Sequence, residues 1–143
     1  MDDKKMDGIE ETADNSMTNE TVDVVKRTLE LSETIIEAID HIITRLSVDD
    51  FEQGAAMLST IGDGMESIEK TFPVILNESF VDPEVSEKCS NLFLEAADVF
   101  EAAVSAVVDG DLDELRARCF ELQTAYKVWD DAANLHLRKI SIM

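Results

Sequence analysis

Apolar side chains recur at alternating spacings of three and four residues along most of this sequence. The clearest run lies between Asp111 and Ile140, and this spacing is typical of an α-helix that buries one stripe of its surface. The stripe consists of Leu112, Leu115, Cys119, Leu122, Tyr126, Trp129, Ala133, His136 and Ile140. We therefore predict one long amphipathic helix here, packed along its length against other helices.

The same spacing predicts three earlier helices, from Asn19 to Leu46, from Ser47 to Phe72 and from Pro83 to Asp109. Because the connections between these long helices are short, successive helices must run antiparallel. The sequence thus predicts an all-α fold, an up-down-up-down antiparallel four-helix bundle that forms a single domain over residues 18–143. Residues 1–17 are polar and acidic without periodicity, which predicts a disordered N-terminal tail.

Two short motifs mark the turns within the predicted helix pairs. Ser47 and Asp50 have the spacing of a capping box, so we expect Ser47 to cap the second helix. Gly110 can end the third helix in a left-handed conformation. Asp111 then caps the fourth helix, with Glu114 completing a second capping box.

The link between the two helix pairs is apolar and contains both prolines of the chain. Pro73 is expected to end or kink the second helix, because it disfavours helical geometry at Phe72. Residues 74–81 then form an apolar connector, which either folds over the open end of the bundle or docks a partner. Asp82 followed by Pro83 is a typical helix start, with an N-cap and proline at the first helical position.

Glycines in the middle of the second helix need an explanation, because each costs about 1 kcal/mol relative to alanine. Gly62 and Gly64 lie beside the apolar stripe. Close approach of a neighbouring helix is the favoured interpretation, and a soft point or a notch for a small ligand is the alternative.

The two halves of the sequence have similar patterns. A shift of 64 residues sets Ser47 on Asp111 and Leu58 on Leu122, but few identical residues coincide. The match indicates two similar helical hairpins and is no evidence of duplication.

The charge is strongly negative, with 32 acidic and 12 basic residues and a formal net charge of −20. Such a field repels phosphate backbones and anionic lipid, so we predict neither nucleic-acid nor membrane partners. The N-terminus lacks the apolar run of a signal peptide, which predicts a cytoplasmic location. Solubility is the simplest role of the charge.

Groups able to do chemistry are sparse, and we predict no enzyme activity, cofactor or metal. The apolar stripes hold no Asp or Glu, and the Glu-x-x-His motif of di-metal bundles is absent. Cys89 and Cys119 lie on apolar stripes, too far apart for a disulfide in the predicted hairpin. Tyr126 in the core requires a hydrogen-bond partner. An exposed His41 allows an alternative function, histidine phosphotransfer, although an ordinary surface histidine is the favoured interpretation.

Some apolar side chains fall off the predicted stripes. They are Val24, Leu31, Leu94, Val108, Phe120, Val128 and Leu135. Either wide stripes simply serve a thick bundle, or these residues form a homodimer interface or a groove for a partner helix. The sequence therefore predicts a non-catalytic interaction module, such as an adaptor, small chaperone or regulatory subunit, that binds a protein partner or self-associates.

Overall fold

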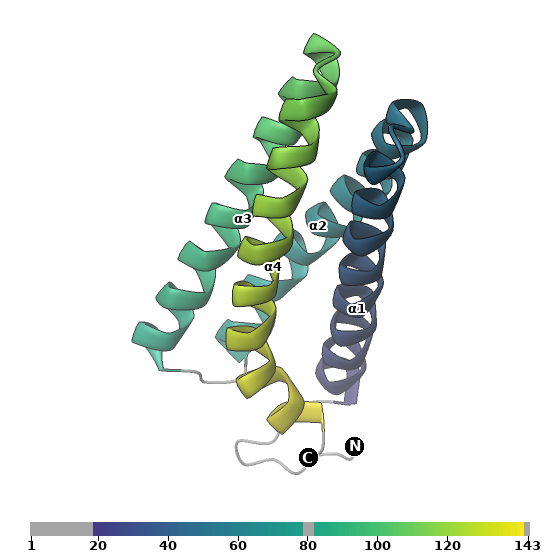
Figure 1. Cartoon of the computed structure of the whole chain (residues 1–143). Helices are drawn as coiled ribbons and strands as arrows, with labels where there is room; N and C mark the ends of the chain where they lie inside the picture. Colours follow the sequence, from purple (N-terminus) through teal and green to yellow (C-terminus); the bar gives the residue numbers. More distant parts are fainter. Residues whose placement is uncertain (1–18, 79–81, 142–143) are drawn as a thin grey trace, which may run out of the picture.

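Four α-helices make up almost all of the part of the chain that the structure describes, residues 19–78 and 82–141. In this computed structural model they run alternately up and down as one bundle (Figure 1). The helices are α1 (Asn19–Ser47), α2 (Phe51–Glu78), α3 (Pro83–Asp109) and α4 (Leu112–Ser141). The predicted all-α, up-down-up-down four-helix bundle is confirmed. The predicted tail over residues 1–17 lies outside the described residues.

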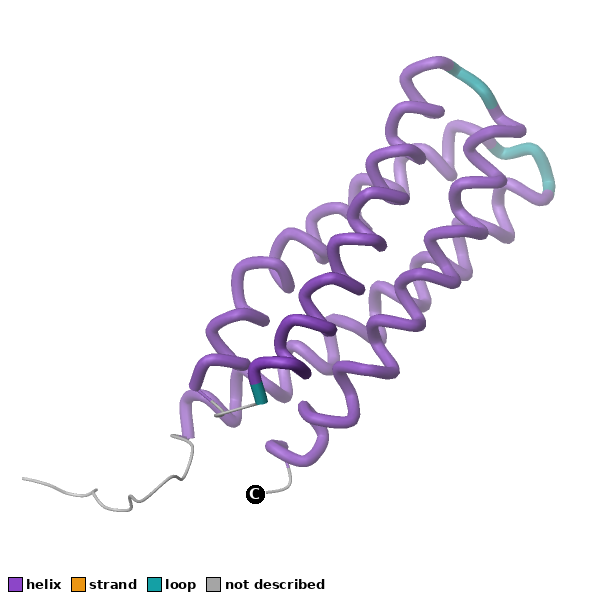
Figure 2. The backbone as a smooth tube through the Cα atoms, turned by 90° about the vertical axis from the view of Figure 1, so that its left-hand side faces the viewer, coloured by secondary structure: helices purple, strands orange, loops and turns teal. Residues whose placement is uncertain are grey.

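The turns α1–α2 and α3–α4 lie at the same end of the bundle (Figure 2) and share one backbone pattern. In each turn the amide of the aspartate before the second helix, Asp50 or Asp111, donates at 3.0 Å to the carbonyl five residues earlier. The residue before that aspartate is left-handed, with φ of 61° at Asp49 and 69° at Gly110. Equivalent turn positions are therefore 61 residues apart, which corrects the shift of 64 predicted from the apolar pattern.

The start of α2 differs from the prediction. Asp50 is the cap, because its carboxylate accepts a hydrogen bond from the Gln53 amide at 3.2 Å. Ser47 instead ends α1, and its hydroxyl donates back to the Ile43 carbonyl at 2.8 Å. The left-handed Asp49 turns the chain so that the second aspartate, and not the serine, faces the free amides of α2.

The starts of α3 and α4 have the predicted caps. Asp82 accepts from the Glu84 amide at 2.8 Å, and Asp111 accepts from the Glu114 amide at 3.0 Å. The predicted capping box at α4 does not close, because the Asp111 amide donates to the Ala106 carbonyl at 3.0 Å, and the Glu114 carboxylate accepts instead from Arg118 at 2.7 Å.

Of the two outcomes predicted for Pro73, an end of the helix is contradicted, because α2 continues through the proline. The helix continues for five residues beyond Pro73. Proline removes one helical hydrogen bond, but the extra turn buries Ile75 and Leu76, which are 1% and 4% exposed. Their burial offsets the cost. The predicted connector over 74–81 is therefore helical at its start, and the rest of it lies outside the described residues.

The core extends along the bundle, and the predicted stripe of α4 supplies its centre. Its six successive positions from Leu115 to Ala133 are at most 1% exposed. The Trp129 ring packs edge-on against Phe72 of α2 and Phe93 of α3, with ring centroids 5.2 and 5.1 Å apart. One α4 side chain thus touches both the neighbouring helix α3 and the diagonally opposite helix α2.

Close packing of the neighbouring helices explains the two glycines in the middle of α2. This is the interpretation that the sequence favoured. A Cβ added at Gly62 would lie 2.7 Å from the Phe100 ring of α3, and one at Gly64 would lie 2.9 Å from Ile35 of α1. Neighbouring side chains therefore occupy the space that a larger residue would need.

The helices do not pack equally. α1–α2, α3–α4 and α1–α4 are in contact over long stretches, whereas α2 and α3 approach each other over a much shorter one. The bundle is therefore two hairpins that are closed on the α1–α4 side and looser on the α2–α3 side.

Candidate functional site

A hollow lies where α2 and α3 separate near the Pro73 end of α2. Its volume is about 140 Å³, and its lining is almost entirely apolar. The lining residues are Ile68, Glu69, Phe72, Pro73, Ser90, Phe93 and Leu94. We call this hollow the α2–α3 groove. Because Pro73 has no N–H, the carbonyl of Glu69 also lacks its usual helical donor here.

The floor of the groove is built from aromatic rings. Phe72 and Phe93 line it, and both rest edge-on against the buried Trp129. The indole Nε1 of Trp129 has no hydrogen-bond acceptor among the described residues. The single tryptophan of the chain therefore lies directly beneath the groove.

An exposed apolar face of α3 continues from the groove. Leu94 lines the groove and is 53% exposed, and Val108 is 79% exposed. Leu94, Glu101 and Val108 are spaced by seven residues, so they lie on one face of the helix. We call these three residues the Leu94–Val108 face.

The two helices that border the groove have the largest net negative charges of the four helices, and α1 follows with six acidic and three basic residues. α2 contains five acidic residues and one lysine, and α3 contains six acidic residues and one lysine. In contrast, α4 contains five acidic and five basic residues. Glu69 belongs to the groove lining itself, and Glu101 lies between the two apolar residues of the Leu94–Val108 face. The groove is therefore an apolar site in an acidic setting.

The structure distributes the seven predicted interface residues over three places. Val24 and Leu31 are half-buried against the core, and Leu31 lies beside Gly64 of α2. Leu94 and Val108 lie on the α3 face just described. The remaining residues, Phe120, Val128 and Leu135, are 48%, 48% and 65% exposed on α4.

The exposed residues of α4 form a second apolar surface. Phe120 and Val128 line a shallow hollow with Glu95 of α3. Phe120, Val128 and Leu135 are separated by eight and seven residues, which is about two helical turns each. We call these three residues the α4 stripe. Two separate apolar surfaces, and not one patch, are thus available to a partner.

Polar side chains join α1 and α4 in the interior. The Ser32 hydroxyl donates to Asp130 Oδ1 at 2.5 Å and lies 2.9 Å from the Tyr126 hydroxyl. Because the serine proton is directed to the carboxylate, Tyr126 is the donor to Ser32. Asn134 Nδ2 donates to the second oxygen of Asp130 at 2.8 Å. Tyr126 thus has the hydrogen-bond partner that its burial was predicted to require.

This arrangement shifts the ionisation of the phenol. Burial raises the pKa of Tyr126, the nearby Asp130 carboxylate raises it further, and the hydrogen bond with Ser32 opposes both effects. The phenol is therefore neutral at physiological pH and serves as a structural hydrogen-bond donor.

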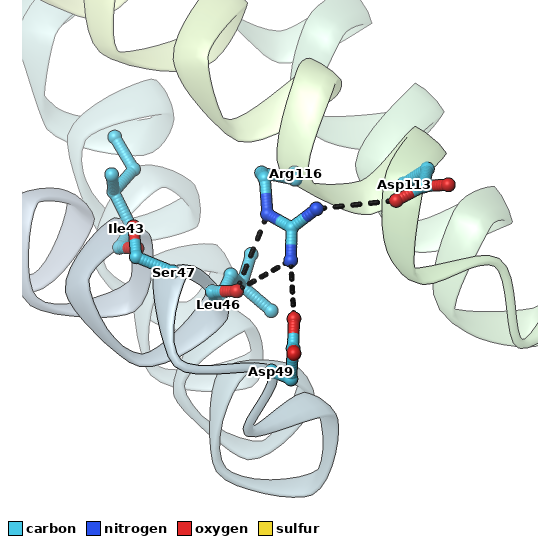
Figure 3. Close-up of polar contacts among 6 residues, drawn as sticks. All are labelled: Ile43, Leu46, Ser47, Asp49, Asp113 and Arg116. Atoms are coloured by element: carbon cyan, nitrogen blue, oxygen red, sulfur yellow. Dashed lines mark hydrogen bonds and ion pairs between the residues drawn. The ribbon is translucent and has the colours of Figure 1, made fainter.

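Arg116 joins the two hairpins at the turn end of the bundle (Figure 3). Its guanidinium donates to the Leu46 carbonyl and to Asp49 Oδ1, both at 2.8 Å, and to Asp113 Oδ1 at 3.1 Å. Nothing in the sequence pattern pointed to this residue. By contrast, Ser32 lies three residues after Leu29 and four before Ile36, so the apolar spacing of α1 alone places this polar side chain toward the core.

The groups that could act in catalysis are dispersed. Cys89 and Cys119 are buried, unpaired thiols as predicted, and burial raises the pKa of both, to about 11 for Cys119. His41 is exposed on α1. Within the described ranges, no three or more His, Cys, Asp or Glu side chains are grouped to hold a metal ion. In the same ranges, none of the helices combines the length and hydropathy needed to cross a bilayer.

Taken with its surfaces, the fold defines an acidic antiparallel four-helix bundle with one loosely packed side. The chain belongs to the family described as "Domain of unknown function (DUF8042)", whose model matches residues 23–131. The match extends from α1 into α4, so it includes all four helices. Neither a curated protein nor a solved structure matches the chain.

Proposed function

We propose that this protein is a non-catalytic interaction module of the cytoplasm, an adaptor, small chaperone or regulatory subunit that binds a protein through apolar helix faces. The observation that carries the proposal is the exposure of large apolar side chains on two surfaces, the Leu94–Val108 face and the α4 stripe. Large apolar side chains that stay exposed along one face of a helix are a feature of many binding sites.

The two surfaces differ in the partner that they suit. Each copy of the chain has a formal charge of −20, which opposes self-association through the acidic helices α2 and α3. The α4 helix has balanced charge, so the α4 stripe is the surface on which a second copy could pack. A partner protein of opposite charge suits the α2–α3 side.

Site-specific photo-cross-linking in the cells of origin tests the proposal. A photoreactive amino acid replaces Leu94 in one variant and Phe120 in another, and it replaces the exposed polar residue Glu37 of α1 in the control. We expect a discrete adduct from at least one apolar position and none from Glu37. Light scattering on the purified protein distinguishes a homodimer, whose adduct has twice the chain mass, from a different partner.

The proposal fails if neither apolar position gives an adduct, or if Glu37 gives the same adducts as Leu94 and Phe120. The phosphotransfer alternative predicts something different, an acid-labile label on His41 after incubation with a phosphodonor. The interaction role predicts no such label.

A further inference from the structure

We infer that the α2–α3 groove binds an amphipathic helix that carries lysine or arginine beside its apolar face. This inference rests on the interaction role proposed above and adds the place on the molecule and the chemistry of the partner. It uses three observations, namely the loose α2–α3 packing, the apolar lining and the acidic border.

The shape of the site suits a helix. α2 and α3 are in close contact near Gly62 and Phe100, while an apolar hollow opens between them farther along, near Pro73. A helix can lay one apolar stripe into such a depression, as bundles do when they add a helix. Leu94 and Val108 are 14 positions apart, or about 21 Å along α3. A partner helix of four to five turns therefore spans the groove and the Leu94–Val108 face.

The negative charge of α2 and α3 favours a positively charged partner. Eleven acidic residues and two lysines lie on α2 and α3, and one of the lysines, Lys70, already pairs with Glu66 at 3.4 Å. Glu69 and Glu101 lie beside the apolar residues that the partner would cover. Cations that flank an apolar stripe match this arrangement, whereas a second copy of this acidic chain is repelled.

The fluorescence of a core tryptophan can report whether the α2–α3 groove is occupied. Trp129 is the only tryptophan of the chain, and its ring contacts Phe72 and Phe93, which both line the groove. A helix that displaces these two rings changes the surroundings of the indole. The fluorescence of Trp129 should therefore shift when the groove is filled, but should shift less when a ligand binds on the α4 stripe.

The experiment uses the full chain and a designed peptide of about 18 residues, long enough to form four to five helical turns. Its leucines are spaced three and four residues apart, its other face carries lysine and alanine, and it has no aromatic residue. A matched control peptide has glutamate at every lysine position. We expect the lysine peptide to bind and to shift Trp129 fluorescence, with an affinity that falls as NaCl is raised. The glutamate peptide should not bind.

Charge-neutral variants locate the site. The double variant Leu94→Gln, Val108→Gln should weaken binding of the lysine peptide by about tenfold or more. The reason is that each leucine or valine buried on binding contributes apolar area. The matched control, Phe120→Gln with Val128→Gln on the α4 stripe, should keep the wild-type affinity. Circular dichroism verifies that both variants remain helical.

A second pair of variants tests the charge. The double variant Glu69→Gln, Glu101→Gln should lower both the affinity for the lysine peptide and the dependence of that affinity on NaCl. The matched control, Glu33→Gln with Glu37→Gln on α1, should change both quantities less. The inference is overturned if the lysine peptide fails to bind, or if the Leu94→Gln, Val108→Gln variant binds it as well as the wild type. If photo-cross-linking instead succeeds at Phe120 alone, the interaction role stands and the groove assignment is wrong.

Discussion

The two sides on which the hairpins meet are built differently. On the α1–α4 side, polar side chains cross the interface at several levels, from Arg116 at the turns to Ser32 and Tyr126 in the interior. On the α2–α3 side, the helices touch near Gly62 and Phe100 and then part around an apolar hollow. A buried hydrogen bond demands one geometry, whereas apolar contacts tolerate small displacements. The difference indicates that the α1–α4 side fixes how the two hairpins meet, whereas the α2–α3 side, where we propose binding, is held by apolar contacts alone among the interactions described.

The largest loss of stability is expected from Trp129→Ala, because this residue is shared by both sides. The substitution removes the ring that supports Phe72 and Phe93 and leaves a cavity in the centre of the core. We expect it to lower the free energy of unfolding by about 3–5 kcal/mol in urea titrations followed by circular dichroism. Trp129→Phe should cost clearly less, since it keeps a ring. An equal loss in the two variants would show that the aromatic floor is unimportant.

High pH should weaken the α4 side of the core without any mutation. The folded-state pKa of Cys119, about 11, lies above its ordinary value of 9.0, and burial also raises the pKa of Tyr126. A raised pKa in the folded state means that stability is complete below the unfolded pKa and is lost as pH rises. For Cys119 this loss falls between about pH 9 and 11 and reaches about 2–3 kcal/mol.

Urea titrations at a series of pH values measure this dependence, and Cys119→Ala should reduce its slope above pH 9. A flat profile in the wild-type protein up to pH 11 would contradict the burial of the thiol.

Ser32→Ala should remove the hydrogen bonds that join α1 to Tyr126 and Asp130 of α4. The variant removes the hydroxyl that hydrogen-bonds both Tyr126 and Asp130, at a cost of about 1–3 kcal/mol. Adding Tyr126→Phe should cost little more in the Ser32→Ala background, because the phenol has then already lost its acceptor. A double-mutant cycle in urea measures this coupling, and additive losses would show that the two hydroxyls act independently.

Arg116→Met should have the smallest effect, about 1 kcal/mol, because the guanidinium is partly exposed. It removes the only side chain shown in Figure 3 that reaches from α4 to Leu46 and Asp49. Arg118→Met is the matched control, since Arg118 pairs with Glu114 and Glu121 of its own helix. Thermal unfolding should show a lower midpoint for Arg116→Met than for Arg118→Met. The reverse order would mean that the turn contact adds nothing.

Periodicity was sufficient to predict the helices, their order and the core stripe of α4 from Leu115 to Ala133, beyond which Leu137 and not the predicted His136 is buried. Those features depend on local spacing and on caps such as Asp82 and Asp111, which the sequence displays directly. The sequence left open whether Pro73 ends or kinks α2, and it could not show that the local preference to end a helix would lose to the burial of Ile75 and Leu76, a tertiary effect. Ser47 was misjudged because the left-handed conformation of Asp49 has no clear sequence signal in a non-glycine residue.

The candidate groove was only partly predictable. Leu94 and Val108 were recognised as apolar residues off the main stripe, but nothing in the spacing indicated that α2 and α3 separate beside them. A stripe shows which face of a helix is buried, and it does not show how closely two particular helices approach. The same limit explains why Val24 and Leu31 were grouped with the other apolar residues off the stripes, although the structure shows both half-buried against the core.

The unequal sharing of charge between α4 and the pair α2 and α3 has a consequence at distances beyond contact. Counted over the four helices, the charge is more negative on the α2–α3 side than on the α1–α4 side, which gives the bundle an electric dipole with its negative pole on the loosely packed side. In the field of an approaching cationic protein, such a dipole experiences a torque that turns this pole forward. Encounters would then begin in a productive orientation, and the association rate, more than the lifetime of the complex, would depend on ionic strength.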